Sequence, residues 1–230
     1  MNFKLSPSDF AFLWEQCKMC FYLKVVRNIR QPSMPMAGIF KRIESLQMNF
    51  YNNKHTKEIH SDLPAGVIRC GERWVESQVI KLSGYNATCF IFGKFDTVIQ
   101  FEDKSWGVVD FKTTDTKDEH IGLYSRQLHA YTYALENPSL RPLKLRREPL
   151  KLTPITKLGL LCFEPTAIKQ PGVGQHSYEG KVSWIEMKRD DEGFSNFIGK
   201  ILTILESPDP PDPSPECQWC NYHSKLKYMK

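Results

Sequence analysis

The sequence of 230 residues predicts a single α/β domain with a mixed central β-sheet, flanking helices and a terminal region clasped by cysteines. Three observations lead to this prediction. Short apolar runs of the strand type, punctuated by Gly71, Gly84 and Gly93, fill the middle of the chain. Segments with apolar residues at helical spacing precede and follow these runs. Two Cys-x-x-Cys pairs stand near opposite ends of the sequence.

The first predicted helix covers residues 6–26. Ser6 can cap its start, and Asp9 occupies the place of a capping-box acid three residues later. Cys17 and Cys20 are three residues apart and would therefore share one face of this helix.

The remaining elements follow from the same patterns of spacing and punctuation. Their expected ranges are helix 38–52, strands 73–82, 88–92, 94–101 and 106–112, helix 123–136, strands 157–163 and 181–187, and helix 190–206. The segment between the last two strands is rich in glycine and proline, which predicts a mobile loop. Residues 207–216 contain five prolines and predict a stiff strap. Residues 217–230 form a basic tail that contains two cysteines.

Residues 93–114, GKFDTVIQFEDKSWGVVDFKTT, carry the chemistry of the chain. They predict two strands joined by a short polar turn. Asp110 and Lys112 alternate with Phe111, so they point to the same face of the second strand. An acid and a cation thus stand side by side, and Asp96 on the first strand supplies a second acid.

The carboxylates of Asp96 and Asp110, if brought together, would repel each other and be costly to dehydrate. A divalent cation removes that cost, and Mg²⁺ and Mn²⁺ favour such oxygen ligands. A lysine beside the ion could orient a water molecule or stabilise negative charge on a phosphate. The sequence therefore predicts a metal site with Lys112 beside it. An ion-paired surface hairpin is the alternative explanation for the same residues.

Four segments in this order resemble the PD-(D/E)XK nuclease superfamily. They are GKFD at 93–96, GVVDFKTT at 107–114, YSRQLHAYTYAL at 124–135, and an early cysteine before Phe-Tyr-Leu combined with a late cysteine cluster. The chain looks most like the branch with the RecB-type nuclease domain and the CRISPR-associated exonucleases. The resemblance spans Ser6 to Cys220 and implies a restriction-endonuclease-like core.

The resemblance also implies an activity, namely a deoxyribonuclease that hydrolyses phosphodiester bonds in DNA with Mg²⁺ or Mn²⁺. Asp96 and Asp110 would bind the ion, and Lys112 would position the attacking water or the scissile phosphate. Gln127 and Tyr131 lie four residues apart on one face of a predicted helix and would hold the substrate strand. The implied partner is DNA, with a single-stranded region.

The chain departs from the family pattern on the helix at 38–52. Resembling nucleases often carry a metal-binding histidine four residues after a glycine here, and this sequence has Arg42 in that place. The departure puts one metal ligand and the activity in doubt. Glu44 is a nearby carboxylate that could substitute for the histidine.

Four cysteines, Cys17, Cys20, Cys217 and Cys220, offer a set of thiolates suited to tetrahedral zinc or to an iron–sulfur cluster. In the resembling nucleases, one early and three late cysteines hold a four-iron, four-sulfur cluster. This chain instead has two early and two late cysteines. The expected cofactor is therefore an iron–sulfur (4Fe-4S) cluster, with zinc as the alternative.

Charge and hydropathy limit the partners and the location that the sequence predicts. The net charge of +5 is compatible with binding a phosphate backbone but does not require it. Residues 141–157 contain six cationic residues but one acidic residue, Glu148. The cations are Arg141, Lys144, Arg146, Arg147, Lys151 and Lys157. No apolar run approaches the ~20 residues of a membrane helix, and the first ten residues are too polar for a signal peptide. We therefore expect a cytoplasmic protein with no membrane partner.

Two other functions compete with hydrolysis. Arg42 at the histidine position favours a catalytically weak or inactive nuclease fold that binds DNA without cutting it. The chain could equally be a structural subunit of a DNA repair or CRISPR-like assembly, with protein partners. A redox enzyme is disfavoured because the sequence has no glycine-rich nucleotide-binding motif.

Overall fold

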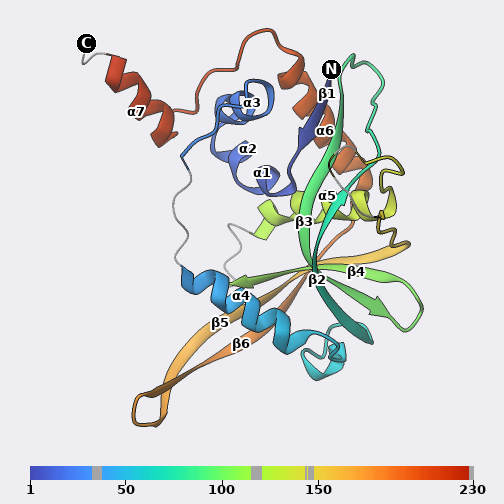
Figure 1. Cartoon of the computed structure of the whole chain (residues 1–230), viewed down its shortest axis with the longest axis vertical. Helices are drawn as coiled ribbons and strands as arrows, with labels where there is room; N and C mark the ends of the chain where they lie inside the picture. The colour runs from blue at the N-terminus through green and yellow to red at the C-terminus, as the bar shows by residue number, and fades with distance from the viewer. Residues whose placement is uncertain (33–37, 115–120, 143, 145–147, 228–230) are drawn as a thin grey trace.

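The structure is a computed structural model that describes residues 1–32, 38–114, 121–142, 144 and 148–227, with the backbone alone for 40, 70, 72, 226 and 227. A six-stranded mixed sheet has the order β1-β3-β4-β5-β6, and β2 also pairs with β3. The strands are β1 (Asn2–Leu5), β2 (Gly66–Glu76), β3 (Thr88–Phe101), β4 (Trp106–Thr113), β5 (Ile155–Gly172) and β6 (Gln175–Met187). The predicted α/β class with a mixed sheet and flanking helices is confirmed (Figure 1).

Helices cover both faces of this sheet. They are α1 (Pro7–Ala11), α2 (Leu13–Gln16), α3 (Lys18–Val26), α4 (Gly38–Tyr51), α5 (Ile121–Glu136), α6 (Asp191–Glu206) and α7 (Gln218–Lys227), with a short 3₁₀ turn, η1 (Thr56–Glu58). Successive residues of β4 pack into two different hydrophobic cores. Val108 packs into the larger core and Val109 into the smaller. Because side chains alternate along a strand, the two cores lie on opposite faces of the sheet.

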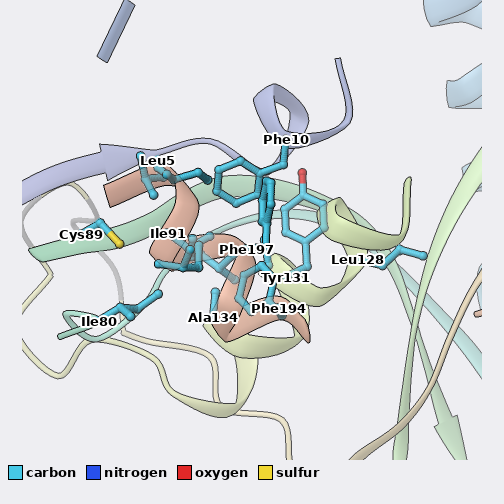
Figure 2. Close-up of a cluster of buried hydrophobic side chains, with 14 of the residues drawn as sticks. Leu5, Phe10, Ile80, Cys89, Ile91, Leu128, Tyr131, Ala134, Phe194 and Phe197 are labelled. Atoms are coloured by element: carbon cyan, nitrogen blue, oxygen red, sulfur yellow. The ribbon is translucent and has the colours of Figure 1, made fainter. Parts of the chain in front are cut away.

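The larger core lies between the sheet, α1, α5 and α6. Phe10 packs edge-on against Phe197, with ring centroids 5.3 Å apart. Figure 2 shows Tyr131 of α5 among these rings. The smaller core lies beneath α4, where Tyr51 stacks on Phe111 of β4 at 5.3 Å. These two cores fix α5 and α4 relative to the central strands.

The single helix predicted at 6–26 is wrong, because the chain forms three short helices there. Cys17 has extended backbone angles (φ −167°, ψ 112°) and acts as the N-cap of α3. Cys17 and Cys20 therefore do not share a helical face. Ser6 is the N-cap of α1 but makes no side-chain cap, and Asp9 instead pairs with Lys24 at 2.5 Å.

The β region also differs from the predicted boundaries. Strand β1 was not expected, yet its Phe3 and Leu5 pair with Cys89 and Ile91 of β3 and are buried. Strand β3 runs unbroken through Gly93, where a break was expected. The side-chain-free Gly93 instead lets Pro7 approach closely, because a Cβ there would lie 2.7 Å from the proline ring.

The segment predicted as a mobile loop between 163 and 181 is a long hairpin formed by β5 and β6. It projects from the body of the molecule (Figure 1), and its residues are largely exposed. The strand register shifts between Pro165 and Ala167 and between Lys169 and Gly172. Proline cannot donate to the ladder, so the pairing adapts with irregularities beside Pro165 and Pro171.

The C-terminal segment returns to the start of the chain. Residues 207–216 form neither helix nor strand, and α7 follows, which the sequence did not predict. Through this path Cys217 and Cys220 reach Cys17 and Cys20. Within the part of the chain that the structure describes, no helix is both long and apolar enough to cross a membrane.

Candidate active site and metal centre

Strands β3 and β4 bring the two predicted acids face to face. Thr97 pairs with Val109 and Val98 pairs with Val108 in an antiparallel register. Continuing that register by one residue places Asp96 opposite Asp110. Directly opposed side chains lie on the same face within contact distance, so the carboxylates converge as the spacing predicted.

Lys112 completes the group on β4. Its Nζ lies 2.5 Å from Oδ2 of Asp110, and the two side chains are 23% and 5% exposed. Burial lowers the pKa of Lys112, but the charge and hydrogen bond of Asp110 outweigh this effect and raise that pKa overall. Lys112 is therefore a cation at neutral pH.

Asp96 is the acid whose ionisation is most disturbed. Burial raises the pKa of Asp96 to about 9, helped by a hydrogen bond to Asp110 and by the charge of that carboxylate. The charge of Lys112 lowers the pKa of Asp96, but by less than burial and Asp110 raise it. In the absence of a bound cation the acid pair therefore holds a proton at neutral pH.

Helix α5 presents a row of polar side chains to these acids. The hydroxyl of Tyr131 donates to the backbone oxygen of Lys94 at 2.7 Å, which ties α5 to β3. Burial raises the pKa of Tyr131, and the charges of Asp110 and Asp96 raise it further. Gln127 is buried one turn earlier, and its Oε1 has no hydrogen-bond partner among the described residues.

Tyr124 and Cys162 also contact the site, and sequence reasoning missed both. The Nζ of Lys112 lies 4.6 Å from the ring centroid of Tyr124. The signal for Tyr124 was present, since it precedes Gln127 by three residues on one helical face. Cys162 of β5 pairs with Lys112 of β4, and no local pattern in the sequence predicts that pairing.

The helix that carries the departure from the family pattern lies close to the site. The charge of Glu44 on α4 contributes to raising the pKa of Asp96. Glu44 is half-buried, whereas Arg42 is exposed. Of the two residues, Glu44 is the one that acts electrostatically on the acids.

The residues of this site fit a divalent cation. Two carboxylates meet on one face, and burial together with the charge of Asp110 favours the protonated form of Asp96. Oε1 of Gln127 is buried and lacks a hydrogen bond from the residues that the structure describes, and the only cation beside Oδ2 of Asp110 among those residues is Lys112. Carboxylate and amide oxygens in such a buried place are the ligands that Mg²⁺ and Mn²⁺ favour.

The four predicted cysteines form a second, separate centre. Their Sγ atoms all lie within 4.8 Å of one another, and all four residues are buried. The Sγ of Cys17 lies 3.8 Å from that of Cys220, and the Sγ of Cys20 lies 3.4 Å from Cys220 and 3.8 Å from Cys217. The backbone N–H of Ser214 donates to Cys17 Sγ at 3.5 Å, an interaction that stabilises thiolate.

Four thiolates this close together are suited to hold a metal. Four sulfurs at ~2.3 Å from a tetrahedral zinc lie ~3.8 Å apart. In a four-iron cluster each thiolate binds a different iron on the outside of the cluster, so the sulfurs must stand farther apart. Three of the sulfur pairs lie 3.4 to 3.8 Å apart, and all four sulfurs lie within 4.8 Å of one another.

The cation cluster predicted at 141–157 is placed only in part, because Arg146 and Arg147 lie outside the described residues. Arg141, Lys144 and Lys151 are exposed, whereas Lys157 pairs with Glu186 at 2.6 Å.

Comparison with known proteins agrees with this arrangement. Residues 40–224 match the model of the PD-(D/E)XK nuclease superfamily. A crystal structure of a protein designated SSO0001 is similar with a TM-score of 0.50 and 14% sequence identity, covering 89% of this chain and 78% of that chain; this likeness concerns the fold alone. No curated protein sequence matches. With the family match spanning most of its length, the chain belongs to the PD-(D/E)XK nuclease superfamily.

Proposed function

We propose that this protein is a metal-dependent deoxyribonuclease that hydrolyses phosphodiester bonds. The observation that carries the proposal is the buried acid pair, Asp96 and Asp110, with Lys112 2.5 Å from Asp110. Structural ion pairs rarely bury two acids against one cation, because the second charge is left uncompensated. A perturbed acid beside a cation is typical of a catalytic site.

Asp96 and Asp110 would hold the ion in this proposal, with Glu44 as a further carboxylate near them. Mg²⁺ or Mn²⁺ in this place would supply stabilisation of negative charge on the phosphate. Lys112 is cationic, so it stabilises charge or orients water rather than accepting a proton. Gln127, with its unpartnered Oε1, and Tyr131 would position the attacking water and the substrate strand.

The test compares cleavage of single-stranded and duplex DNA by the wild type and by Asp110→Ala and Lys112→Ala in Mn²⁺. We expect each variant to lose on the order of 10²-fold or more of the rate, as removal of a positioned charge does. The exposed pair Lys157–Glu186 on β5 and β6 provides the control, since Glu186→Ala breaks an ion pair of similar length. Unchanged cleavage by both site variants would reject the proposal.

Arg42, which replaces the histidine of the resembling nucleases, favours a second function. The chain would then bind DNA, alone or within a repair or CRISPR-like assembly, without cutting it. Intact DNA with every metal tested, together with binding that weakens as salt rises, would favour this function.

For the cysteine centre we propose one tetrahedral Zn²⁺ in place of the 4Fe-4S cluster that the resemblance implies. The support is the short distance between the sulfurs. Elemental analysis and visible absorption of protein purified without oxygen decide between the two. We expect about one zinc per chain and no colour; a brown protein with four irons would overturn this assignment.

A further inference from the structure

A pocket of about 270 Å³ lies beside β3, lined by residues of β1, β2, α1 and α3. Trp74 of β2 stands on its wall with 53% of its surface exposed. The ring of Trp74 stacks on Phe92 of β3, with centroids 4.9 Å apart and planes inclined by 22°. Large rings are usually placed in the core, so a stacked and accessible pair indicates a binding surface.

The charges around the two rings are mainly positive. The Nζ of Lys4 lies 5.4 Å from the ring centroid of Phe92, and Arg30 lines the same pocket. Lys24 and Asp9 also line it, but they form an ion pair at 2.5 Å and cancel each other. Lys4 and Arg30 therefore leave the pocket with a net positive charge.

The pocket lies close to the candidate active site. Phe92 precedes Asp96 by four residues on β3, which corresponds to about 13 Å between their Cα atoms at ~3.3 Å per residue. Trp74 pairs across the sheet with Lys94, the residue whose carbonyl accepts the Tyr131 hydroxyl. The two rings therefore lie on or beside the same stretch of β3 as Asp96, with Phe92 about 13 Å from it along the strand.

We propose that Trp74 and Phe92 form a stacking platform for a base in the single-stranded part of the substrate. This inference rests on the proposed function, because it assumes a nucleic-acid strand at Asp96. Exposed aromatic rings beside cations hold single strands with little regard to sequence. The bases of a duplex are already stacked on each other, so the platform favours single-stranded substrates.

The experiment measures binding of the full chain, without added Mg²⁺ or Mn²⁺ so that no cleavage occurs, to an oligothymidylate of about 12 nucleotides. One position of the oligonucleotide carries 2-aminopurine, whose fluorescence is quenched on stacking. We expect Trp74→Ala to weaken binding by about 5- to 150-fold, the loss of one stacked base, and to relieve quenching at one position. Trp74→Phe keeps a ring and should restore most of the affinity.

Controls separate the platform from general effects. Tyr178→Ala removes another exposed strand aromatic, 67% exposed, on the projecting hairpin, and should leave binding unchanged. Lys4→Glu should also weaken binding. Affinity of Trp74→Ala for the single strand within twofold of wild type, or an equal loss for blunt duplex, would overturn the platform. Because the titration contains no added Mg²⁺ or Mn²⁺, its result is independent of the cleavage test of Asp110→Ala, so either proposal can fail alone.

Discussion

At the scale of single residues, the chemistry depends on two acids that the fold forces together. Asp96 and Asp110 face each other across β3 and β4, and the strand pairing holds their backbones in this position. Lys112 compensates one negative charge. Burial of the second carboxylate, together with the hydrogen bond and charge of Asp110, raises the pKa of Asp96 to about 9.

This raised pKa predicts how the metal-free protein responds to pH. The raised pKa keeps the Asp96 proton in the folded state up to pH about 9, whereas the unfolded chain releases it near the ordinary aspartate pKa of 3.8. The stability that this proton confers is present at low pH and is lost as pH rises through that window. Urea unfolding in EDTA between pH 5 and 9 should show Asp96→Asn gaining stability relative to wild type as pH rises.

The matched control for this prediction is Asp103→Asn. Asp103 lies in the turn between β3 and β4, and hydrogen bonds from Ser105 lower its pKa. Its contribution is therefore lost only as pH falls through that lowered pKa, so the difference from wild type should stay constant between pH 5 and 9. A flat difference for Asp96→Asn as well would contradict the raised pKa.

At the scale of elements, the position of α5 over the acids depends on a close approach at Gly93. A Cβ on this residue would lie 2.7 Å from Cδ of Pro7 and 3.1 Å from Cε1 of Tyr131. Helix α1 and helix α5 both press against β3 at this glycine. The absence of one side chain thus helps to place Tyr131 beside Asp96 and Asp110.

Gly93→Ala should therefore destabilise the protein by about 1–3 kcal/mol, the usual cost of overpacking. It should also lower the cleavage rate, because Tyr131 is displaced. Gly122→Ala in the first turn of α5 is the control, since nothing lies within 4 Å of its added Cβ; its stability should change by less than about 1 kcal/mol. Thermal unfolding measures both, and equal stabilities would refute the close-packing argument.

At the scale of the whole molecule, the cysteine centre joins the two ends of the chain. Cys20 and Cys217 are 197 residues apart in sequence, and their Sγ atoms lie 3.8 Å apart. A cross-link that closes so long a loop restricts the unfolded chain, with an effect on the order of 5 kcal/mol in the chain-entropy view. The centre contains none of the active-site residues, so its contribution is to stability.

Cys220→Ser should abolish metal binding at this centre and lower the unfolding temperature. A zinc chelator should lower the unfolding temperature of the wild type towards that of the variant and leave the variant unchanged. Cys89→Ala removes a buried thiol outside the centre and should retain the full metal content. Full metal content in Cys220→Ser would refute the four-thiolate centre.

The sequence by itself determined the family and the α/β class, and it pointed to the candidate residues of both centres. This was possible because β4 carries its information locally: alternation places Asp110 and Lys112 on one face whatever surrounds the strand. The Gln127 and Tyr131 pair is equally local, since four residues make about one helical turn. Patterns of side-chain direction within one strand or one helix can therefore be predicted from the sequence alone.

Only the tertiary structure decided what depends on distant partners. Helix 6–26 broke at Cys17 because that cysteine must turn towards a cluster that includes Cys217 and Cys220. Tyr124 and Cys162 joined the site through packing of α5 and pairing of β5 with β4. The spacing of the four sulfurs is likewise set by two ends of the chain meeting in space. Spacing along a chain fixes the direction of side chains, but distances between remote groups are fixed only when cores form around them.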